Sequence, residues 1–525
     1  MADVQAIAAT IRKLAPGAQL ASDSRRIKLG DVFFALSVAP SVAPGDGADG
    51  RNFIEAAIEQ GAALIVLDPA GFDFNTSWNA SWNVPYITVE QLKQQAGRIV
   101  HAYYEQPDSA MFTVGVTGTN GKTSSAVWLG QALSRAGELA AVVGTLGVGL
   151  FRARGEVEFE VTGYTTPDAV LLGRTLAQLR AQGAASLAIE VSSHALEQGR
   201  VDGMHFDVAL FTNLTRDHLD YHGSMEAYEA AKTRLFDWPA LKTAVVNLDD
   251  AMGLRLIAHL KNRPALAGAI PLIGYTLQDA ASVPDIDGVL MLRASQLRAG
   301  RSGGTEFHLE CALGASQIKT QLVGHFNISN ALGVMGALLA KGLTLRAAIE
   351  ALEALQAAPG RMQQVGGQDA PLIVIDYAHT PDALEKTLVA LRSVASDRGG
   401  QLWCVFGCGG DRDPGKRPQM GKIAQTADHV LVTSDNPRSE DPQSIIDQIV
   451  AGMDTANPAS TVQQQADRAA AILLAIKHAA KPDVILLAGK GHEPYQEIKG
   501  KKLAFSDADH AQLALSARLT MMRPN

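Results

Sequence analysis

Short apolar runs alternate with amphipathic segments along most of this 525-residue chain. Among the first hundred residues, the runs Asp31 to Leu36 and Ala63 to Leu67 flank a segment with helical spacing at Asn52 to Gln60. Apolar runs of about four to eight residues are typical of buried strands, and the segments between them predict helices. The pattern therefore predicts a small N-terminal α/β domain over residues 1–107.

A second series of runs extends over residues 108–356. His325 to Leu355 predicts two helices that are separated at Gly342. Alternation of strands and helices predicts a central parallel sheet with helices on both faces, which binds ligands at the carboxyl ends of its strands. The strands that we expect are Met111 to Val116, Ala141 to Val143, Leu187 to Val191, Val208 to Phe211 and Thr243 to Leu248.

A third series occupies residues 357–525 and predicts a Rossmann-like doubly wound domain. Its expected strands are Leu372 to Ile375, Leu402 to Phe406, His429 to Thr433 and Val484 to Leu487, with helices near Asp382 to Val394, Pro442 to Met453 and Arg468 to Ala479. Loops that follow such strands commonly carry the chemistry. The polar, glycine-rich loops here are Asp376 to Thr380, Gly407 to Lys416, Ser434 to Asp441 and Gly489 to Gln496.

Composition narrows the possible partners. With 47% apolar residues, 19% charged residues and a net charge of −8, the chain lacks the basic surplus that nucleic acid or anionic lipid would favour. The N-terminus lacks the charge order of a signal peptide, and no apolar run reaches the roughly 18 residues of a membrane span. We therefore expect a cytoplasmic protein that binds neither nucleic acid nor membrane. Of its three cysteines, we expect Cys404 and Cys408 to be buried free thiols.

The segment behind the predicted strand Met111 to Val116 carries the clearest chemical signal, and a helix is expected from Ser124 to Ala136. Its residues are Gly118, Thr119, Asn120, Gly121, Lys122 and Thr123. Glycines between a strand and a helix let backbone N–H groups close on phosphate oxygens, a lysine adds positive charge, and a Thr hydroxyl can bind Mg²⁺. We therefore expect a P-loop ATPase-like domain that binds ATP or GTP. The strict pattern requires glycine where Val116 stands, so a simple glycine turn is the alternative.

Two further polar segments follow strands of the same sheet. Glu190 ends one strand, where an acidic residue beside a phosphate loop is the expected second ligand of nucleotide-bound Mg²⁺, and helix capping is the alternative. Asn213 to Gly223 gathers titratable and aromatic residues that together suggest a metal and phosphate site. Ser192 and His194 lack the glycine turn of a hydrolase nucleophile, so we discount hydrolysis.

Arginines occur in two loops of the last domain, Gly409 to Asp413 and Asp435 to Arg438. A guanidinium group binds a carboxylate through two parallel hydrogen bonds. Together with Gly489 to Glu493, these loops suggest a zwitterionic substrate with carboxylates on the arginines and an ammonium on Glu493. Salt bridges between the loops are the alternative.

These motifs, in this order, resemble those of the Mur ligase family, the ATP-dependent amide-forming enzymes of peptidoglycan precursor assembly. The resemblance spans nearly the whole chain and implies a three-domain α/β fold. The matching segments are Gly118 to Thr123, Glu190 to His194, Asn213 to Gly223, His325 to Asn330, Gly360 to Met362 and Asp376 to Pro381.

Within this family, the Asp-Asn-Pro-Arg sequence at Asp435 to Arg438 resembles the signature of the diaminopimelate-adding branch, and further similarities occur at Asp23 to Arg25, Gly30 to Phe33, and Thr165 with Thr166. The resemblance implies a ligase that uses ATP and Mg²⁺ to join meso-diaminopimelate to UDP-N-acetylmuramoyl-L-alanyl-D-glutamate through an acyl phosphate. It implies that Arg438 selects diaminopimelate, because lysine lacks a second carboxylate. We expect a monomer whose partners are these small molecules.

The resemblance also assigns residues to roles. The implied catalytic residues are Lys122, Glu190, His218 and Lys232, with Thr123 and Glu190 on one Mg²⁺ and His218 with a carbamylated Lys232 near another. The implied ATP-binding residues are Gly118, Thr119, Asn120, Gly121, Lys122, Thr123, Ser124, Asn327, Asn330, Arg361, Asp376 and His379. Those for the UDP-muramoyl-peptide are Ser22, Ser24, Asp46, Gly47, Ala48, Thr165, Thr166, Ser192, Gln198 and Arg200. Those for diaminopimelate are Arg412, Asp435, Asn436, Pro437, Arg438, Gly489 and Glu493.

Two departures from the family pattern affect parts of these assignments: Ser37 to Gly47, which overlaps the uridine loop, is longer and richer in Ala and Pro than expected, and Tyr164 stands where Asn is common. A folylpolyglutamate synthase is the nearest alternative, since it would share the phosphate loop and the lysine but not the N-terminal domain or the Asp-Asn-Pro-Arg sequence. A nucleotide-dependent switch or transport ATPase would not account for the arginine-bearing loops.

Overall fold

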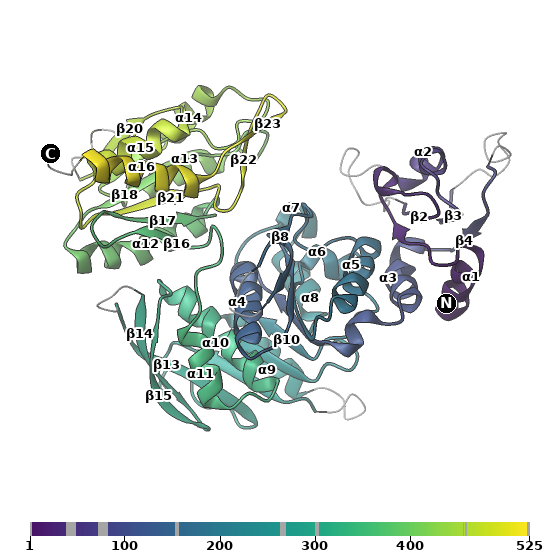
Figure 1. Ribbon diagram of the computed structural model, residues 1–525. Helices are drawn as coiled ribbons and strands as arrows, with labels where there is room; N and C mark the ends of the chain where they lie inside the picture. Colours follow the sequence, from purple (N-terminus) through teal and green to yellow (C-terminus); the bar gives the residue numbers. More distant parts are fainter. Residues whose placement is uncertain are drawn as a thin grey trace. The chain divides into compact units, whose positions relative to one another are not determined.

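The computed structural model describes residues 3–37, 49–71, 82–152, 157–262, 269–299, 304–454, 456 and 459–521, so the predicted uridine-loop residues Asp46, Gly47 and Ala48 lie outside the described residues. The chain forms two compact units. One comprises Met1–Ala294, Leu309–Ala315 and Ser329–Leu352, and the other comprises Ser295–His308, Ser316–Ile328 and Glu353–Asn525. The first unit contains the N-terminal sheet and most of the central sheet, and the second contains the last sheet (Figure 1).

The N-terminal sheet is parallel, with the strand order β1-β2-β3-β4. Val32 and Phe34 pack with residues of α1 and α3, whereas Phe33 and Ala35 pack with residues of α2. Because side chains alternate between the faces of a strand, this apolar run is buried on both sides. The strands are β1 (Leu20–Ala21), β2 (Val32–Ala35), β3 (Leu64–Leu67) and β4 (Tyr86–Thr88), and the helices are α1 (Val4–Leu14), α2 (Ile54–Glu59) and α3 (Leu92–Tyr103).

The central sheet has the strand order β15-β14-β13-β12-β11-β10-β5-β9-β6-β7-β8. The pairs from β13 to β6 are parallel, as predicted, whereas β7 and β8 pair antiparallel at one edge. Its strands are β5 (Phe112–Thr117), β6 (Ala140–Gly144), β7 (Gly147–Phe151), β8 (Phe159–Glu160), β9 (Ser186–Glu190), β10 (Val208–Phe211), β11 (Thr243–Asn247), β12 (Leu272–Thr276), β13 (Val289–Ala299), β14 (Thr305–Cys311) and β15 (Gly314–Thr320).

Helices cover both faces of the central sheet. Ile189 and Phe211 pack in one apolar cluster with Leu172 of α5, whereas on the other face a Cβ added at Gly336 of α10 would lie 2.7 Å from Val245. The predicted break at Gly342 is confirmed, because this residue has φ +99° and separates α10 from α11. The helices are α4 (Lys122–Arg135), α5 (Ala169–Ala181), α6 (Ser193–Glu197), α7 (Leu219–His222), α8 (Met225–Thr233), α9 (Ala251–Lys261), α10 (His325–Ala340) and α11 (Leu345–Glu353).

The last sheet has the order β16-β17-β21-β18-β19-β20, in which β16 is antiparallel to β17 and the remaining pairs are parallel. Leu486 packs with residues of α12, α13 and α14, and its neighbours Ile485 and Leu487 pack with residues of α15 and α16, which confirms the doubly wound prediction. The elements are β16 (Gln363–Gly366), β17 (Leu372–Asp376), β18 (Leu402–Phe406), β19 (His429–Val432), β20 (Thr461–Gln464), β21 (Val484–Ala488), α12 (Pro381–Arg398), α13 (Lys416–Ala424), α14 (Pro442–Val450), α15 (Arg468–His478) and α16 (Asp507–Met521), together with the hairpin β22 (Tyr495–Ile498) and β23 (Lys501–Ala504).

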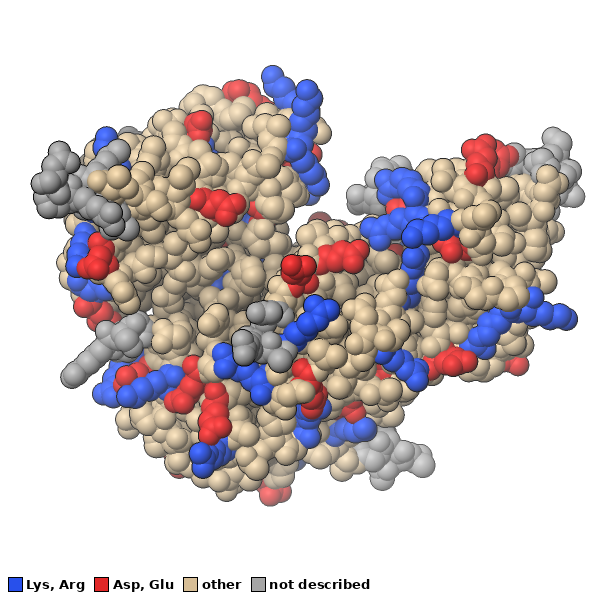
Figure 2. Space-filling view, in the orientation of Figure 1, with Lys and Arg blue, Asp and Glu red and all other residues tan. Residues whose placement is uncertain are grey.

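The cysteine prediction is confirmed, because Cys404 and Cys408 are buried and free. Burial raises the pKa of Cys408 to about 12. Charged side chains of both signs are interspersed on the face shown in Figure 2. Among the described residues, no helix is both long enough and apolar enough to cross a membrane.

Candidate active site

The phosphate-loop segment connects β5 to α4, as the sequence pattern predicts. Gly118 and Gly121 have φ values of +150° and +86°, which residues with a Cβ atom rarely adopt. The Lys122 ammonium folds back over the turn and donates to the carbonyl oxygens of Gly118 and Thr119, each at 2.8 Å. The strand, the glycine turn and the first residue of the helix thus form the cradle that binds phosphate in other proteins.

Residues distant in sequence hold this turn in shape. Asn213 follows β10. Its backbone carbonyl accepts a hydrogen bond from the N–H of Thr119 at 2.8 Å, and its side-chain oxygen accepts one from the N–H of Asn120 at 2.9 Å. A Cβ added at Gly121 would lie 2.6 Å from the side-chain amide of Asn330. The structure therefore brings Asn213 and the predicted ATP-site residue Asn330 to the phosphate loop.

Glu190 is the last residue of β9 and is buried. Its carboxylate accepts hydrogen bonds from the backbone N–H of Thr145 at 2.7 Å and from the Thr145 hydroxyl at 3.2 Å. The same hydroxyl lies 3.1 Å from the hydroxyl of Thr165, which the family resemblance assigns to the peptide substrate. Sequence reasoning missed Thr145, whose position just behind the buried strand β6 was the available signal.

A hard cation such as Mg²⁺ prefers oxygen ligands. Thr123, in the first turn of α4, and Glu190 are both buried and offer a hydroxyl and a carboxylate, so their chemistry fits the predicted magnesium ligands. Among the described residues, no group of three or more His, Cys, Asp or Glu side chains is arranged to hold a metal ion. A magnesium site here would therefore need ligands of other kinds, such as hydroxyls, phosphate oxygens or water.

Lys232 lies near the end of α8 and is buried. Its Nζ donates to the carbonyl oxygen of Gly118 at 2.9 Å and lies 4.4 Å from the ring centroid of Tyr228. An ammonium carries three N–H donors, yet in the described part of the chain this carbonyl is the one hydrogen-bond acceptor of Nζ. Burial and the charge of Lys122 lower the pKa of Lys232 well below its usual value. The surroundings thus suit an uncharged nitrogen with one N–H donor.

Three histidines meet beside Lys232's helix. The ring of His194 lies 4.8 Å from that of His218 and 5.3 Å from that of His222 between centroids. Burial, then the neighbouring His218 and His222, lower the pKa of His194 to about 4. His218, the predicted catalytic histidine, directly precedes α7 with φ +53° and is half-exposed, and burial lowers its pKa as well. At neutral pH the cluster is therefore largely uncharged.

Most residues predicted for the muramoyl-peptide lie together. The Thr166 hydroxyl donates to the carbonyl oxygen of Glu190 at 2.8 Å and lies 3.3 Å from the Ser192 hydroxyl. Arg200 donates to the Gln198 side chain at 2.7 Å and to the carbonyl oxygen of Thr166 at 2.9 Å. These contacts tie Thr166, Ser192, Gln198 and Arg200 to the end of the strand that carries Glu190.

A pocket of about 140 Å³ adjoins this group and is lined in part by Gln198, Arg200 and Tyr164. Asp168 also lines it and accepts a hydrogen bond from the Ser22 hydroxyl at 3.0 Å, which connects the N-terminal sheet to this pocket. The predicted residue Ser24 is buried at the start of a 3₁₀ turn that follows Ser22.

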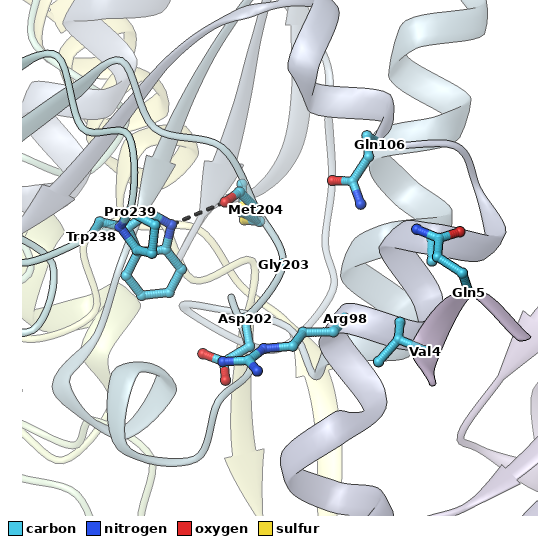
Figure 3. Close-up of a pocket in the computed structure, with 10 residues that line it drawn as sticks. Val4, Gln5, Arg98, Gln106, Asp202, Gly203, Met204, Trp238 and Pro239 are labelled. Carbon is cyan, nitrogen blue, oxygen red and sulfur yellow. Dashed lines mark hydrogen bonds between the residues drawn. The ribbon is translucent and has the colours of Figure 1, made fainter. Parts of the chain in front are cut away.

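A larger pocket of about 390 Å³ lies between α1, α3 and the segments around residues 203 and 238 (Figure 3). The Trp238 indole faces this pocket and its N–H donates to the carbonyl oxygen of Met204 at 3.0 Å. None of the predicted site residues lines it.

In the second unit, the structure brings Arg361, Asp376 and His379 together. Met362 and Ala378 donate their backbone N–H groups to the Asp376 carboxylate, each at 2.9 Å. Tyr377 contacts both Arg361 and His379. Its ring centroid lies 4.3 Å from the guanidinium carbon of Arg361 and 4.6 Å from the ring centroid of His379. The resulting patch combines a flat aromatic face with cationic and acidic groups.

Asn327, also predicted for the ATP site, is buried at the start of α10. Its amide donates to the carbonyl oxygen of Val323 at 2.8 Å. The structure therefore shows a helix-start contact for this residue.

The two arginines predicted for diaminopimelate flank one glycine. A Cβ added at Gly409 would lie 3.0 Å from the Arg438 guanidinium and 3.7 Å from Cγ of Arg412. Arg438 has φ +51°, donates to the carbonyl oxygen of Gly410 at 2.7 Å and lies 3.6 Å from the Glu497 carboxylate. Gly410 in turn packs against the carbonyl oxygen of Pro437. In the structure, the Arg438 guanidinium thus contacts a neighbouring loop and a carboxylate of β22.

An ion pair between buried Arg417 and partly exposed Glu440, which the sequence did not reveal, connects these loops. The Arg417 guanidinium donates to both carboxylate oxygens of Glu440, each at 2.8 Å, and to the carbonyl oxygen of Gly409 at 3.2 Å. The Arg417 hydrogen bonds hold the pKa of Glu440 at about 2. The remaining predicted residues Asp435, Asn436, Gly489 and Glu493 also lie together, around the buried Lys490.

Comparison with known families now identifies the chain. Residues 116–338 match the Mur ligase middle domain, and residues 360–491 match the Mur ligase glutamate ligase domain. The chain belongs to the Mur ligase family. The two matches contain the phosphate loop and the arginine-bearing loops respectively, so the segments with the strongest chemical signal are those that the family models cover.

Mur ligases of one kind are similar over almost the whole chain. A UDP-N-acetylmuramoyl-L-alanyl-D-glutamate--2,6-diaminopimelate ligase of Janthinobacterium sp. (strain Marseille) is 61% identical over 96% of this chain and 95% of the relative. The corresponding enzyme of Ralstonia nicotianae is 50% identical over 96% of this chain and 94% of the relative. A solved structure of such a ligase, with 36% identity, covers 95% of each chain with a TM-score of 0.65.

Proposed function

We propose that this Mur ligase uses ATP to join meso-diaminopimelate to UDP-N-acetylmuramoyl-L-alanyl-D-glutamate in peptidoglycan precursor synthesis, a cytoplasmic step. The observation that carries the proposal is that Arg412 and Arg438 both lie beside Gly409, while Asn436, on the loop of Arg438, donates to the Glu493 carboxylate. Cationic forks suit the carboxylates of diaminopimelate, and a carboxylate suits its ammonium. The 61% identity to a ligase named for this substrate supports the same conclusion.

The reaction begins at the phosphate loop. The loop N–H groups and Lys122 bind the ATP phosphates, and the Lys122 charge stabilises the negative charge that develops as the γ-phosphoryl group moves to the substrate carboxylate. The amine of diaminopimelate then attacks the acyl phosphate, a C–N bond forms, the C–O bond to phosphate breaks, and the amine loses a proton. Thr123 and Glu190 would hold Mg²⁺, which would supply positive charge against the negative charge of the phosphates.

Lys232 fits the family's carbamylated lysine. A carbamate nitrogen keeps a single N–H, which matches the single acceptor, Gly118 O, that Nζ has among the described residues. It also replaces a cation by two hard oxygens, which attract Mg²⁺ where an ammonium would repel it. We therefore propose that Lys232 acts as a carbamate beside the phosphate loop, with His218 nearby.

The nucleotide-peptide is assigned to the first unit. Thr165, Thr166, Ser192, Gln198 and Arg200 would bind the muramoyl-peptide, and Ser22 and Ser24 would bind the uridine nucleotide. The residues of the second unit that we assign to ATP are Asn327, Arg361, Asp376 and His379.

Release of inorganic phosphate tests the function. Purified protein with ATP, Mg²⁺ and UDP-N-acetylmuramoyl-L-alanyl-D-glutamate should release phosphate when meso-diaminopimelate is added, and a larger nucleotide-peptide should appear by mass spectrometry. Lysine at the same concentration should give little release. Phosphate release with a folate and glutamate, but not with diaminopimelate, would instead support the folylpolyglutamate synthase alternative.

A further inference from the structure

A buried lysine, Lys490, stands at the centre of the loops assigned to diaminopimelate. It follows β21 directly, between the glycines of residues 489 and 491, and its side chain is fully buried. Its Nζ lies 3.1 Å from Oδ1 of Asn436, 3.2 Å from Oε2 of Glu493 and 3.8 Å from Oδ1 of Asp435. The ammonium therefore donates hydrogen bonds to Asn436 and Glu493, on two separate loops, and forms an ion pair with Asp435.

These contacts determine how Asn436 and Glu493 are presented. Oδ1 of Asn436 accepts from Lys490 and from the backbone N–H of Glu497 at 2.9 Å, so its amide nitrogen must face Glu493, to which it donates at 2.7 Å. Oε2 of Glu493 thus receives two donors, while Oε1 accepts no hydrogen bond from the residues that the structure describes. One oxygen of Glu493 is anchored and the other is left for a ligand.

A second buried ion pair lies beside this cluster. Arg468 donates to both oxygens of Asp507 at 2.8 and 2.7 Å. Both Asp507 oxygens are therefore occupied, whereas in the described part of the chain Oε1 of Glu493 stays open to an ammonium group, which would pair with a carboxylate already held in place.

We propose that Lys490 is a positioning residue that aims Glu493 and Asn436 at the non-reacting ammonium of diaminopimelate. This inference rests on the proposed function and deepens it. It assigns the amino group and the carboxylate on the distal α-carbon of diaminopimelate to different parts of the site. Lys490 controls recognition of the distal amino group through Glu493, and Arg438 controls recognition of the distal carboxylate.

Two substrate analogues distinguish recognition of the distal amino group from recognition of the distal carboxylate. Lysine keeps the distal amino group but lacks the distal carboxylate, whereas 2-aminopimelate keeps the carboxylate but lacks the amino group. The measurement is kcat/KM for diaminopimelate, lysine and 2-aminopimelate by phosphate release, with Lys490→Met, Arg438→Met and the exposed-lysine control Lys477→Met. Thermal melting of each variant checks that it folds, and Lys490→Gln, which keeps an N–H donor, replaces Lys490→Met if that variant melts early.

Lys490→Met should reduce the preference for diaminopimelate over 2-aminopimelate by at least about tenfold. The reason is that Glu493 would lose its orientation, and loss of one charged hydrogen bond to the distal ammonium corresponds to a change of about that size. It should leave the preference over lysine, and KM for ATP, within about threefold. Arg438→Met should do the reverse, and Lys477→Met should change neither preference.

Three results would overturn the inference. An unchanged preference over 2-aminopimelate would show that Lys490 does not act through Glu493. Equal loss of both preferences would show general disorder of the site. A lower KM for diaminopimelate would show that Lys490 acts only as a competing charge. If the parent protein releases no phosphate with diaminopimelate at all, it is the proposed function that fails, before any variant is compared.

Discussion

The phosphate loop and the amino-acid loops (409–413, 435–440 and 489–497) form their binding surfaces by different means. The phosphate loop is one short segment whose backbone makes the cradle, with glycines at φ values of +150° and +86° and a lysine folded over its own turn. The amino-acid loops are far apart in sequence and are held by side-chain ion pairs such as Arg417 with Glu440. A backbone-built surface should therefore be sensitive to an added Cβ, and a side-chain-built surface to a removed charge.

The largest expected effect concerns Lys232, a buried side chain that donates to the phosphate loop. Lys232→Ala should lower kcat by about 10³-fold, because a group that organises charge at the transferring phosphoryl is lost. Added formate or acetate should restore part of the rate by supplying carboxylate oxygens. Lys261→Ala, at the exposed end of α9, should keep the parent rate. Full activity of Lys232→Ala, or no response to carboxylates, would argue against the carbamate.

The second-largest expected effect follows from removing the charge of Arg438 in the amino-acid loops. Arg438→Ala should lower the preference for diaminopimelate over lysine by about 100-fold, because a carboxylate would lose its charged partner. Competition kinetics with the two amino acids measure this ratio. Arg346→Ala, which removes an exposed arginine paired with Glu350, is the control and should leave the ratio unchanged. If Arg438→Ala still discriminates as the parent does, another residue selects the amino acid.

A smaller effect tests the backbone-built surface. Gly121→Ala should raise KM for ATP by about tenfold, because a Cβ at φ +86° would lie 2.6 Å from Asn330 and distort the turn. Gly137→Ala is a matched control, since Gly137 also has a positive φ, +92°, but a Cβ there would meet no atom within 4 Å. Equal changes in KM for the two variants would show that conformational strain alone, rather than the fit at the loop, is responsible.

The smallest effect concerns stability. Glu440→Gln should lower Tm by about 2–4 °C near neutral pH, because the bidentate pair with Arg417 is lost. Since the pKa of Glu440 in the folded protein is about 2, against an ordinary value of 4.5, its stabilisation is present above pH 4.5 and is lost as the pH falls toward 2. The Tm difference between parent and variant should therefore narrow between about pH 6 and about pH 3. A constant difference would mean that the pair does not contribute as an ion pair.

The sequence by itself determined the elements and the local chemistry. The alternation of apolar runs predicted the strands of β10 and β18 with their observed bounds, and the glycine-rich segment behind β5 predicted the phosphate loop. Both signals are local: a buried strand needs a continuous apolar run, and a phosphate cradle needs glycines next to each other in the chain. The edge strands β7 and β8 were missed because they lack a continuous apolar run that is buried on both faces.

Only the tertiary structure decided which charges meet. Lys490 adjoins Asn436, 54 residues away, and Arg417 adjoins Glu440, 23 residues away, because parallel strands deliver their carboxyl ends to one edge of the sheet. The same applies to Lys232, which looks like any solvated lysine until α8 places it in a buried position beside the Gly118 carbonyl. The meaning of a charged residue depends on its desolvation and its partners, and both are properties of the folded chain.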